Sequence, residues 1–174
     1  MKIIENIKEL IFKQVQKRHP HTPRYQSYRS AQRILILFES DLLERNVQVK
    51  ALIRQLKDDG KDVTAWGYVA KKKVESAVLR DYRVLGMEDF TYWGLPKDYE
   101  RADIARERFD ILLDLNTTNL LPLRYLSVYA QADFKAGAET DEPYLCDFMI
   151  NTQGDNNPAF LFDQILHYIK QVET

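Results

Sequence analysis

The sequence predicts an α/β fold, a three-layer, Rossmann-like arrangement with a mainly parallel sheet and an N-terminal helical extension. Strand-like apolar segments alternate along the chain with segments of helical period, an order typical of doubly wound sheets. Two of the strand segments, Arg33–Glu39 (RILILFE) and Phe109–Asn116 (FDILLDLN), are apolar almost throughout. Such runs are expected for strands covered on both faces. The 174 residues, 45% of them apolar, suffice for one domain, which we expect to occupy residues 33–174.

The extension comprises residues 1–32. Apolar side chains recur at helical spacing over residues 2–18, which predicts a helix. Pro20 and Pro23 must end it, because proline lacks the amide proton and restricts the residue before it. The polar stretch 24–32 has no period and is interpreted as a linker or arm.

A β-α-β unit opens the domain. After the strand Arg33–Glu39, apolar residues at i, i+3, i+4 and i+7 predict a helix that runs to about Asp59. Gly60 then suits the left-handed position that follows a helix end. Asp62–Tyr68 (DVTAWGY) predicts a second strand, parallel to the first.

The rest of the chain continues the alternation. Residues 71–108 are the least regular part, with a possible short helix over 76–82, a strand within 82–92 and a charged helix over 99–108. Asn157 and Pro158 suit the cap and first position of a last helix. Between these parts we expect the strand 109–116, a helix over 120–132, and strands over 134–138 and 144–152.

Composition excludes several classes. The apolar content excludes disorder for the bulk of the chain. The longest uninterrupted apolar run, Ile34–Phe38, is far too short to span a membrane, and we expect no signal peptide. The single cysteine, Cys146, excludes an internal disulfide and indicates a reducing cytoplasm. Neither it nor the histidines show metal-ligand spacing, so we expect no metal site, and no particular cofactor is indicated.

Charge is distributed unevenly. Residues 1–33 carry eight basic and two acidic side chains, a net +6, so the chain's net charge of −1 leaves −7 on the remainder. A basic arm on an acidic body is compatible with contact to nucleic acid, to an anionic membrane surface, or to the body itself. Tyr25 and Tyr28 would either stack on bases or dock the arm onto its own domain. The helix 2–18 could bind a protein partner or a second copy.

Candidate ligand-binding residues follow from position, because no phosphate-binding glycine loop or nucleophile motif is present. Ligands of open parallel sheets bind outside the carboxyl ends of the strands. Polar side chains there could bind the hydroxyl groups of a sugar or nucleotide, or simply cap the following helices. Asp114 is distinctive, because a carboxylate inside an apolar strand needs a partner or a shifted pKa. The candidates are Ser40, Asp41, Asp114, Asn116, Thr117 and Asn151.

Two resemblances accompany this pattern. The segment FDILLDLNTTNLLPLRYLSVYAQADFKAGA (109–138) resembles the N-terminal half of heptosyltransferase-type glycosyltransferases, which implies a Rossmann-like fold. The loop ESDLLERN (39–46) lacks that family's glycine, and the donor-binding second domain has no counterpart, so the mechanism is not implied. With its basic N-terminal helix and the strands FDILLDLN and YLCDFMIN, the whole chain also resembles a small uncharacterised family known mainly from Bacteroidetes-type bacteria.

These observations favour a non-catalytic binding or scaffolding domain. Two alternatives stay open: a nucleotide- or sugar-binding protein or transferase that uses the crevice at the strand ends, and an accessory protein that contacts nucleic acid or membrane through the basic arm.

Overall fold

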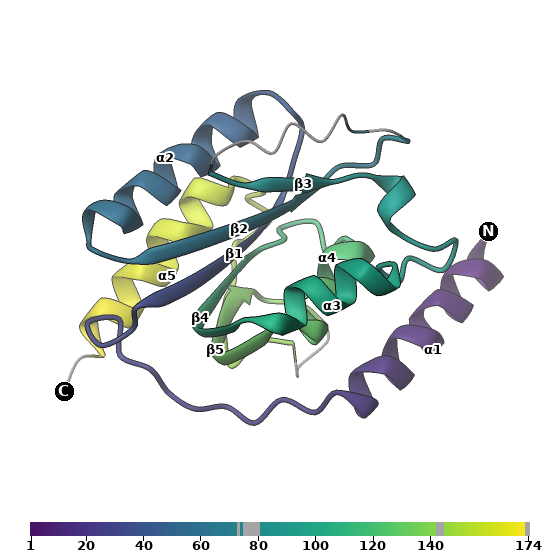
Figure 1. Ribbon diagram of the computed structural model, residues 1–174, viewed down its shortest axis with the longest axis horizontal. Coiled ribbons are helices and arrows are strands. Elements are labelled where there is room, and N and C mark those ends of the chain that lie inside the picture. Colours follow the sequence, from purple (N-terminus) through teal and green to yellow (C-terminus); the bar gives the residue numbers. More distant parts are fainter. Residues whose placement is uncertain (73, 75–80, 142–144, 173–174) are drawn as a thin grey trace.

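A six-stranded, entirely parallel sheet forms the centre of the molecule (Figure 1). The computed structural model describes residues 1–72, 74, 81–141 and 145–172. The strand order is β3-β2-β1-β4-β5-β6, which confirms the predicted Rossmann-like fold class. The strands are β1 (Arg33–Glu39), β2 (Asp62–Tyr68), β3 (Arg83–Leu85), β4 (Arg108–Leu115), β5 (Gln131–Ala138) and β6 (Phe148–Ile150).

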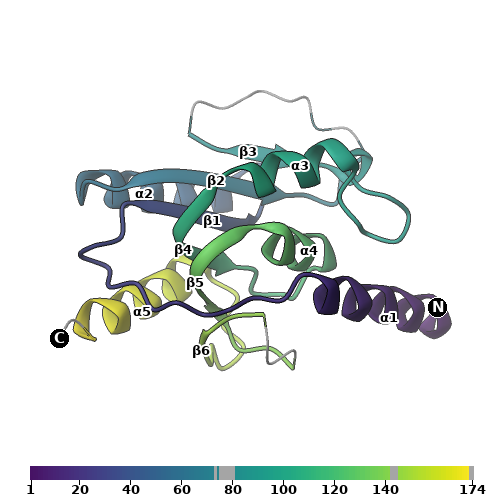
Figure 2. The same ribbon diagram turned by 60° about the horizontal axis from the view of Figure 1, so that its bottom comes forward.

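Helices cover both faces of this sheet, in three layers (Figure 2). Helices α2 and α5 pack on one face, α3 and α4 on the other, and α1 packs on the outside of α4. Within the described residues, no helix is both long enough and apolar enough to cross a bilayer. The helices are α1 (Lys2–Arg18), α2 (Glu44–Asp58), α3 (Asp98–Arg106), α4 (Leu121–Tyr129) and α5 (Pro158–Gln171), with a 3-10 turn, η1 (Met87–Asp89).

Local sequence explains several of these boundaries. Gly60 follows α2 with φ +79°, a left-handed conformation that glycine adopts without strain. Asn157 caps α5, since its side-chain oxygen accepts a hydrogen bond from the N–H of Ala159 at 2.9 Å. Pro158 takes the first helical position, as the sequence predicts.

Two predicted elements differ from the structure, and a third is mostly not described by it. The helix expected over 120–132 ends at Tyr129, because the backbone of Ala130 is extended and leads directly into β5. The strand expected over 144–152 pairs with β5 only over Phe148–Ile150. Most of the short helix expected over 76–82 lies outside the described residues.

Helix α1 is attached to the domain through one buried aromatic residue. Phe12 is fully buried and packs edge-on against Tyr125 of α4, with ring centroids 5.1 Å apart. The guanidinium of Arg124 lies 4.1 Å from the Phe12 ring centroid and pairs with both carboxylate oxygens of Glu9, at 2.6 and 3.0 Å. Because Arg124 is itself buried, this pairing satisfies a charge that would otherwise be costly.

The segment between α1 and β1 docks on the body along its whole course. The N–H of Arg24 donates to the carbonyl of Asp133 at 2.8 Å. Tyr28 is buried, and its hydroxyl donates to Asp59 at 2.6 Å. The buried Nζ of Lys61 donates to the carbonyls of Tyr28 and Ala31, at 2.6 and 2.7 Å. Of the two predicted roles for the arm's tyrosines, docking on their own domain is therefore the one that the structure shows for Tyr28.

We expect Lys61→Met to lower the free energy of unfolding by about 2–4 kcal/mol, because it leaves two buried carbonyls without their charged donor. Urea unfolding followed by circular dichroism measures this. Lys50→Met, on the exposed surface of α2, is the control and should change stability by less than about 0.5 kcal/mol. Equal stability of the two variants would contradict the assigned role of Lys61.

Candidate functional site

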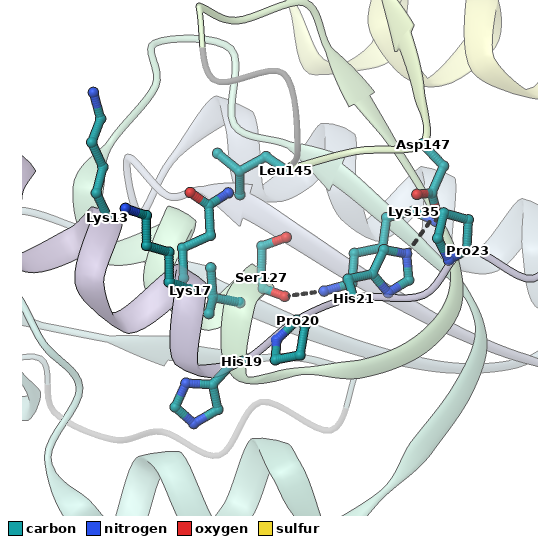
Figure 3. A pocket seen from close by; sticks show the side chains of 12 residues that line it. Lys13, Lys17, His19, Pro20, His21, Pro23, Ser127, Lys135, Leu145 and Asp147 are labelled. Carbon is teal, nitrogen blue, oxygen red and sulfur yellow. Dashed lines mark hydrogen bonds and ion pairs between the residues drawn. The ribbon is translucent and has the colours of Figure 1, made fainter.

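A cavity of about 660 Å³ lies between α1, the segment that follows it, α4 and β5 (Figure 3). The segment before β6 closes it on one side. Its walls therefore come from two regions that are distant in sequence, residues 13–23 on one side and residues 127–135, 145 and 147 on the other. Apolar atoms make up most of the lining, and the polar atoms are mainly basic. The residues that line the cavity are Lys13, Gln16, Lys17, His19, Pro20, His21, Pro23, Ser127, Val128, Lys135, Leu145 and Asp147.

One carboxylate, Asp147, faces these basic groups, and it is already engaged. Its Oδ2 lies 2.8 Å from Nε2 of His21 and accepts a hydrogen bond from the backbone N–H of Lys135 at 2.8 Å. These contacts hold the segment after α1 to the body at the cavity wall. The side chains that line the cavity therefore include more basic groups than acidic ones.

Lys135 is the buried basic residue of the cavity, with only 3% of its surface exposed. Its Nζ donates to the carbonyl of Ser127 in α4 at 2.5 Å, leaving further N–H donors on the ammonium (Figure 3). Burial lowers the pKa of Lys135, while the neighbouring Cys146, Asp147 and Asp114 act to raise it. An additional anionic partner would therefore stabilise the charged form of Lys135.

Two further polar atoms at the cavity wall lack partners. The hydroxyl Oγ of the fully buried Ser127 has no hydrogen-bond partner among the described residues, and neither has Nε2 of Gln16. Both residues line the same cavity as Lys135. Because buried polar groups are normally hydrogen-bonded, these atoms mark the wall as one that a polar ligand group would complete.

Asp114 lies behind this wall, on β4 next to β5. Burial raises the pKa of Asp114 to about 7. A hydrogen bond from the N–H of Asn116 at 3.2 Å and the positive charge of Lys135 act to lower it. Asp114 and Cys146 can pack closely against β5 because residue 137 is a glycine. A Cβ at Gly137 would lie 2.9 Å from the Asp114 carbonyl oxygen and 2.9 Å from Sγ of Cys146. The Cys146 thiol is buried as well, which raises its pKa well above the usual value.

The other residues predicted from strand ends make local hydrogen bonds. Ser40 donates to Asn46 at 2.8 Å, and Asp41 accepts from the backbone N–H of Leu43 at 2.8 Å. Asn116 exchanges two hydrogen bonds with the backbone of Leu120, at 2.8 and 3.0 Å. These are the capping and turn roles that the sequence left open as the alternative.

The two remaining candidates, Thr117 and Asn151, also make hydrogen bonds within the chain. Thr117 donates to the carbonyl of Asn156 at 3.2 Å, and Asn151 accepts from the N–H of Gln153 at 2.9 Å, beyond the edge strand β6. The structure thus brings Ser40, Asp114 and Asn116 to neighbouring strands and leaves Asn151 at the sheet's edge. Ligand binding by the six candidates stays a prediction, and none of them lines the cavity described above.

At the topological switch point between β1 and β4, a side chain bridges the two loops. Oε1 of Glu39 accepts from both the N–H and the hydroxyl of Thr118, at 2.6 and 2.7 Å, and its Oε2 pairs with Arg45 at 2.5 Å. The position where Rossmann-like folds bind ligands is therefore occupied by an ion pair and two hydrogen bonds of the chain itself. Within the described ranges no group of three or more His, Cys, Asp or Glu residues could hold a metal ion.

Asp114 should make stability depend on pH. Its folded pKa of about 7 exceeds the value of about 3.9 for an unfolded aspartate, so the folded state binds more protons between these pH values. This carboxyl therefore lowers the free energy of unfolding as pH rises from about 4 to 7. We expect the fall in stability between pH 4.5 and 7.5 to be smaller in Asp114→Asn, by on the order of 3 kcal/mol. Urea unfolding at both pH values tests this, with the exposed Asp163→Asn as control; an unchanged pH dependence would contradict it.

Comparison with known proteins places the chain in a family. No curated protein matches the sequence. Among solved structures, E. coli heptosyltransferase WaaC with ADP aligns at 15% identity and a TM-score of 0.46, over 76% of this chain and 46% of that one. The chain thus spans about half the length of that protein. Residues 5–172 match a family of unknown function, DUF6913. This chain belongs to that family, which confirms the prediction of a family without an assigned function.

Proposed function

We propose that the protein is a non-catalytic binding protein for a small organic anion with an apolar body, held in the cavity between α1 and α4. One observation carries the proposal: the buried ammonium of Lys135 and the unpartnered hydroxyl of Ser127, whose carbonyl that ammonium binds, belong to the wall of one largely apolar cavity. A carboxylate or phosphate oxygen could accept hydrogen bonds from both groups.

The charge of the lining supports an anion over a cation or a neutral ligand. Lys17 and Lys135 both line the cavity, while the carboxylate of Asp147 is taken up by His21 and by a backbone N–H. A buried cation is costly unless it is paired, and an incoming anion supplies that pair. Its negative charge would also favour the protonated state of Lys135, opposing the effect of burial, which lowers the pKa of that residue.

The apolar lining supports a ligand with a hydrocarbon or aromatic body. Pro20, Pro23, Val128 and Leu145 contribute side chains without polar atoms, and Val128 and Leu145 also adjoin the cluster around Phe12. A volume of about 660 Å³ lies within the range of small-molecule sites, which are mostly apolar with a few convergent polar groups.

In this proposal residues 33–174 are the domain and residues 1–32 are the part that completes its cavity.

We place the function in the cytoplasm, because the one cysteine of the sequence, Cys146, is a buried thiol, as is typical of proteins from reducing compartments. The alternative proposal is that a sugar or nucleotide binds in the crevice at the carboxyl ends of the strands. The same experiment therefore includes nucleoside monophosphates.

The experiment is a thermal-shift panel of aliphatic carboxylates, aromatic carboxylates and nucleoside monophosphates, each carboxylate paired with its neutral amide. At about 100 times its dissociation constant, a ligand adds about 2.7 kcal/mol, which raises the Tm of a chain of this size by roughly 5–10 °C. We expect such a shift from an anion and none from its amide. Equal shifts from acid and amide would exclude recognition of the charge.

Variants then locate the site. Lys135→Met should abolish the shift, and Lys17→Glu, which alters only an exposed residue, should weaken binding about tenfold, equivalent to about 1.4 kcal/mol. Lys57→Met, on α2 at the opposite face of the sheet, is the matched control and should bind as the wild type does. If both cavity variants bound normally while Asn116→Ala did not, the strand-end crevice would be the site.

A further inference from the structure

Helix α1 has an apolar stripe that faces away from the domain. The helix packs on α4 through Phe12, with Val15 beside it. Ile3 and Leu10, by contrast, are 74% and 62% exposed, and Ile4 and Ile7 are also exposed. At 100° per residue these four side chains fall on one side of the helix, about half a turn from Phe12. Docking on the body therefore leaves this second apolar face uncovered.

Exposed aromatic residues border one edge of the stripe. Tyr92 and Trp93 lie in the loop between η1 and α3, and Tyr92 is 70% exposed. Nζ of Lys8 lies 5.7 Å from the Tyr92 ring centroid, which joins this loop to α1. This contact places the loop beside the helix. Tyrosine and tryptophan are the residues that prefer the boundary between water and lipid headgroups.

Basic residues border the other edge. The helical period places Lys2, Lys13 and Lys17 next to the stripe on the side away from Tyr92. The acidic Glu9 lies elsewhere on the helix and is paired with Arg124 at the body. Residues 2–18 carry five basic side chains against Glu5 and Glu9, so α1 contributes +3 to the net +6 of residues 1–33, against −7 on the remainder of the chain.

We propose that this surface, formed by the α1 stripe with Tyr92 and Trp93, docks on an anionic lipid bilayer. An apolar helical stripe flanked by lysines and by interfacial aromatics is the arrangement that lies in the headgroup plane, held by apolar burial and by attraction to anionic lipids. The aliphatic residues of the stripe do not line the cavity, whereas Lys13 and Lys17 border both surfaces. Variants of the aliphatic residues therefore test this inference separately from the ligand proposed for the cavity.

A second copy of the chain is a poorer occupant. The four aliphatic side chains together expose about as much surface as two complete side chains. A stable interface buries about 800 Å² on each partner. Two such helices would also bring their lysine edges together, and like charges facing each other oppose association.

The test is co-sedimentation with vesicles of phosphatidylcholine alone and of phosphatidylcholine with 30% phosphatidylglycerol. We expect binding to the anionic vesicles and release as salt rises from 50 to 500 mM, because screening weakens the attraction. The double variant Ile3→Asn/Leu10→Asn should bind at least tenfold more weakly. Leu43→Asn/Val47→Asn, which changes two comparably exposed aliphatic residues at the start of α2, is the matched control and should bind as the wild type does.

Circular dichroism melting establishes that both double variants are folded, which is expected since all four side chains are exposed. Equal binding to neutral and anionic vesicles, no binding to either, or an unaffected Ile3→Asn/Leu10→Asn variant would each overturn the proposal. So would a dimer in sedimentation velocity that this variant, and not the control, converts to monomer. The cavity ligand, measured separately by thermal shift, should be retained by both double variants.

Discussion

The placement of α1 depends on Arg124. This arginine is buried, so its charge must be paired, and it is paired with Glu9 while its guanidinium stacks on Phe12. Both partners come from α1, which fixes the rotation of that helix about its own axis. One side of the helix then completes the cavity, and another side carries its aliphatic residues into solvent. Each proposed role of α1 is thus a consequence of the same ion pair.

Several buried ionisable groups lie in the half of the sheet nearest this helix. Asp114 and Lys135 belong to neighbouring strands, and the buried thiol of Cys146 follows shortly after. A fold built only for stability would place apolar residues at such positions, because desolvating a carboxyl or an ammonium costs free energy. Their presence beside a cavity is the pattern found at functional sites.

The fold was largely predictable from the sequence, and the cavity was not. The continuously apolar strands β1 and β4 can exist only between two helical layers, so their composition predicts the three-layer architecture. The same reasoning singled out Asp114 as a charge inside an apolar strand. Lys135 carries an equivalent signal, because within the segment FKAGA it is the one charged residue among apolar and small ones.

The remaining cavity residues have no such local signal. Lys17, His21 and Ser127 meet at one place only because α1 docks on α4 and the following segment crosses β5, contacts that depend on tertiary packing. The candidates at the strand ends illustrate the converse. Ser40 and Asn116 are small polar residues after strands, a composition that suits ligands and turns equally, and their hydrogen bonds show them serving turns.

The two edges of the sheet have a consequence for how this protein meets others. The edge strands β3 and β6 pair over three residues each, so each edge offers few unpaired backbone groups. Long exposed edges are the usual templates for intermolecular strand pairing, amyloid growth and domain swapping. Few backbone groups are therefore available for strand pairing between molecules, so we expect this protein to recognise other molecules through its side chains.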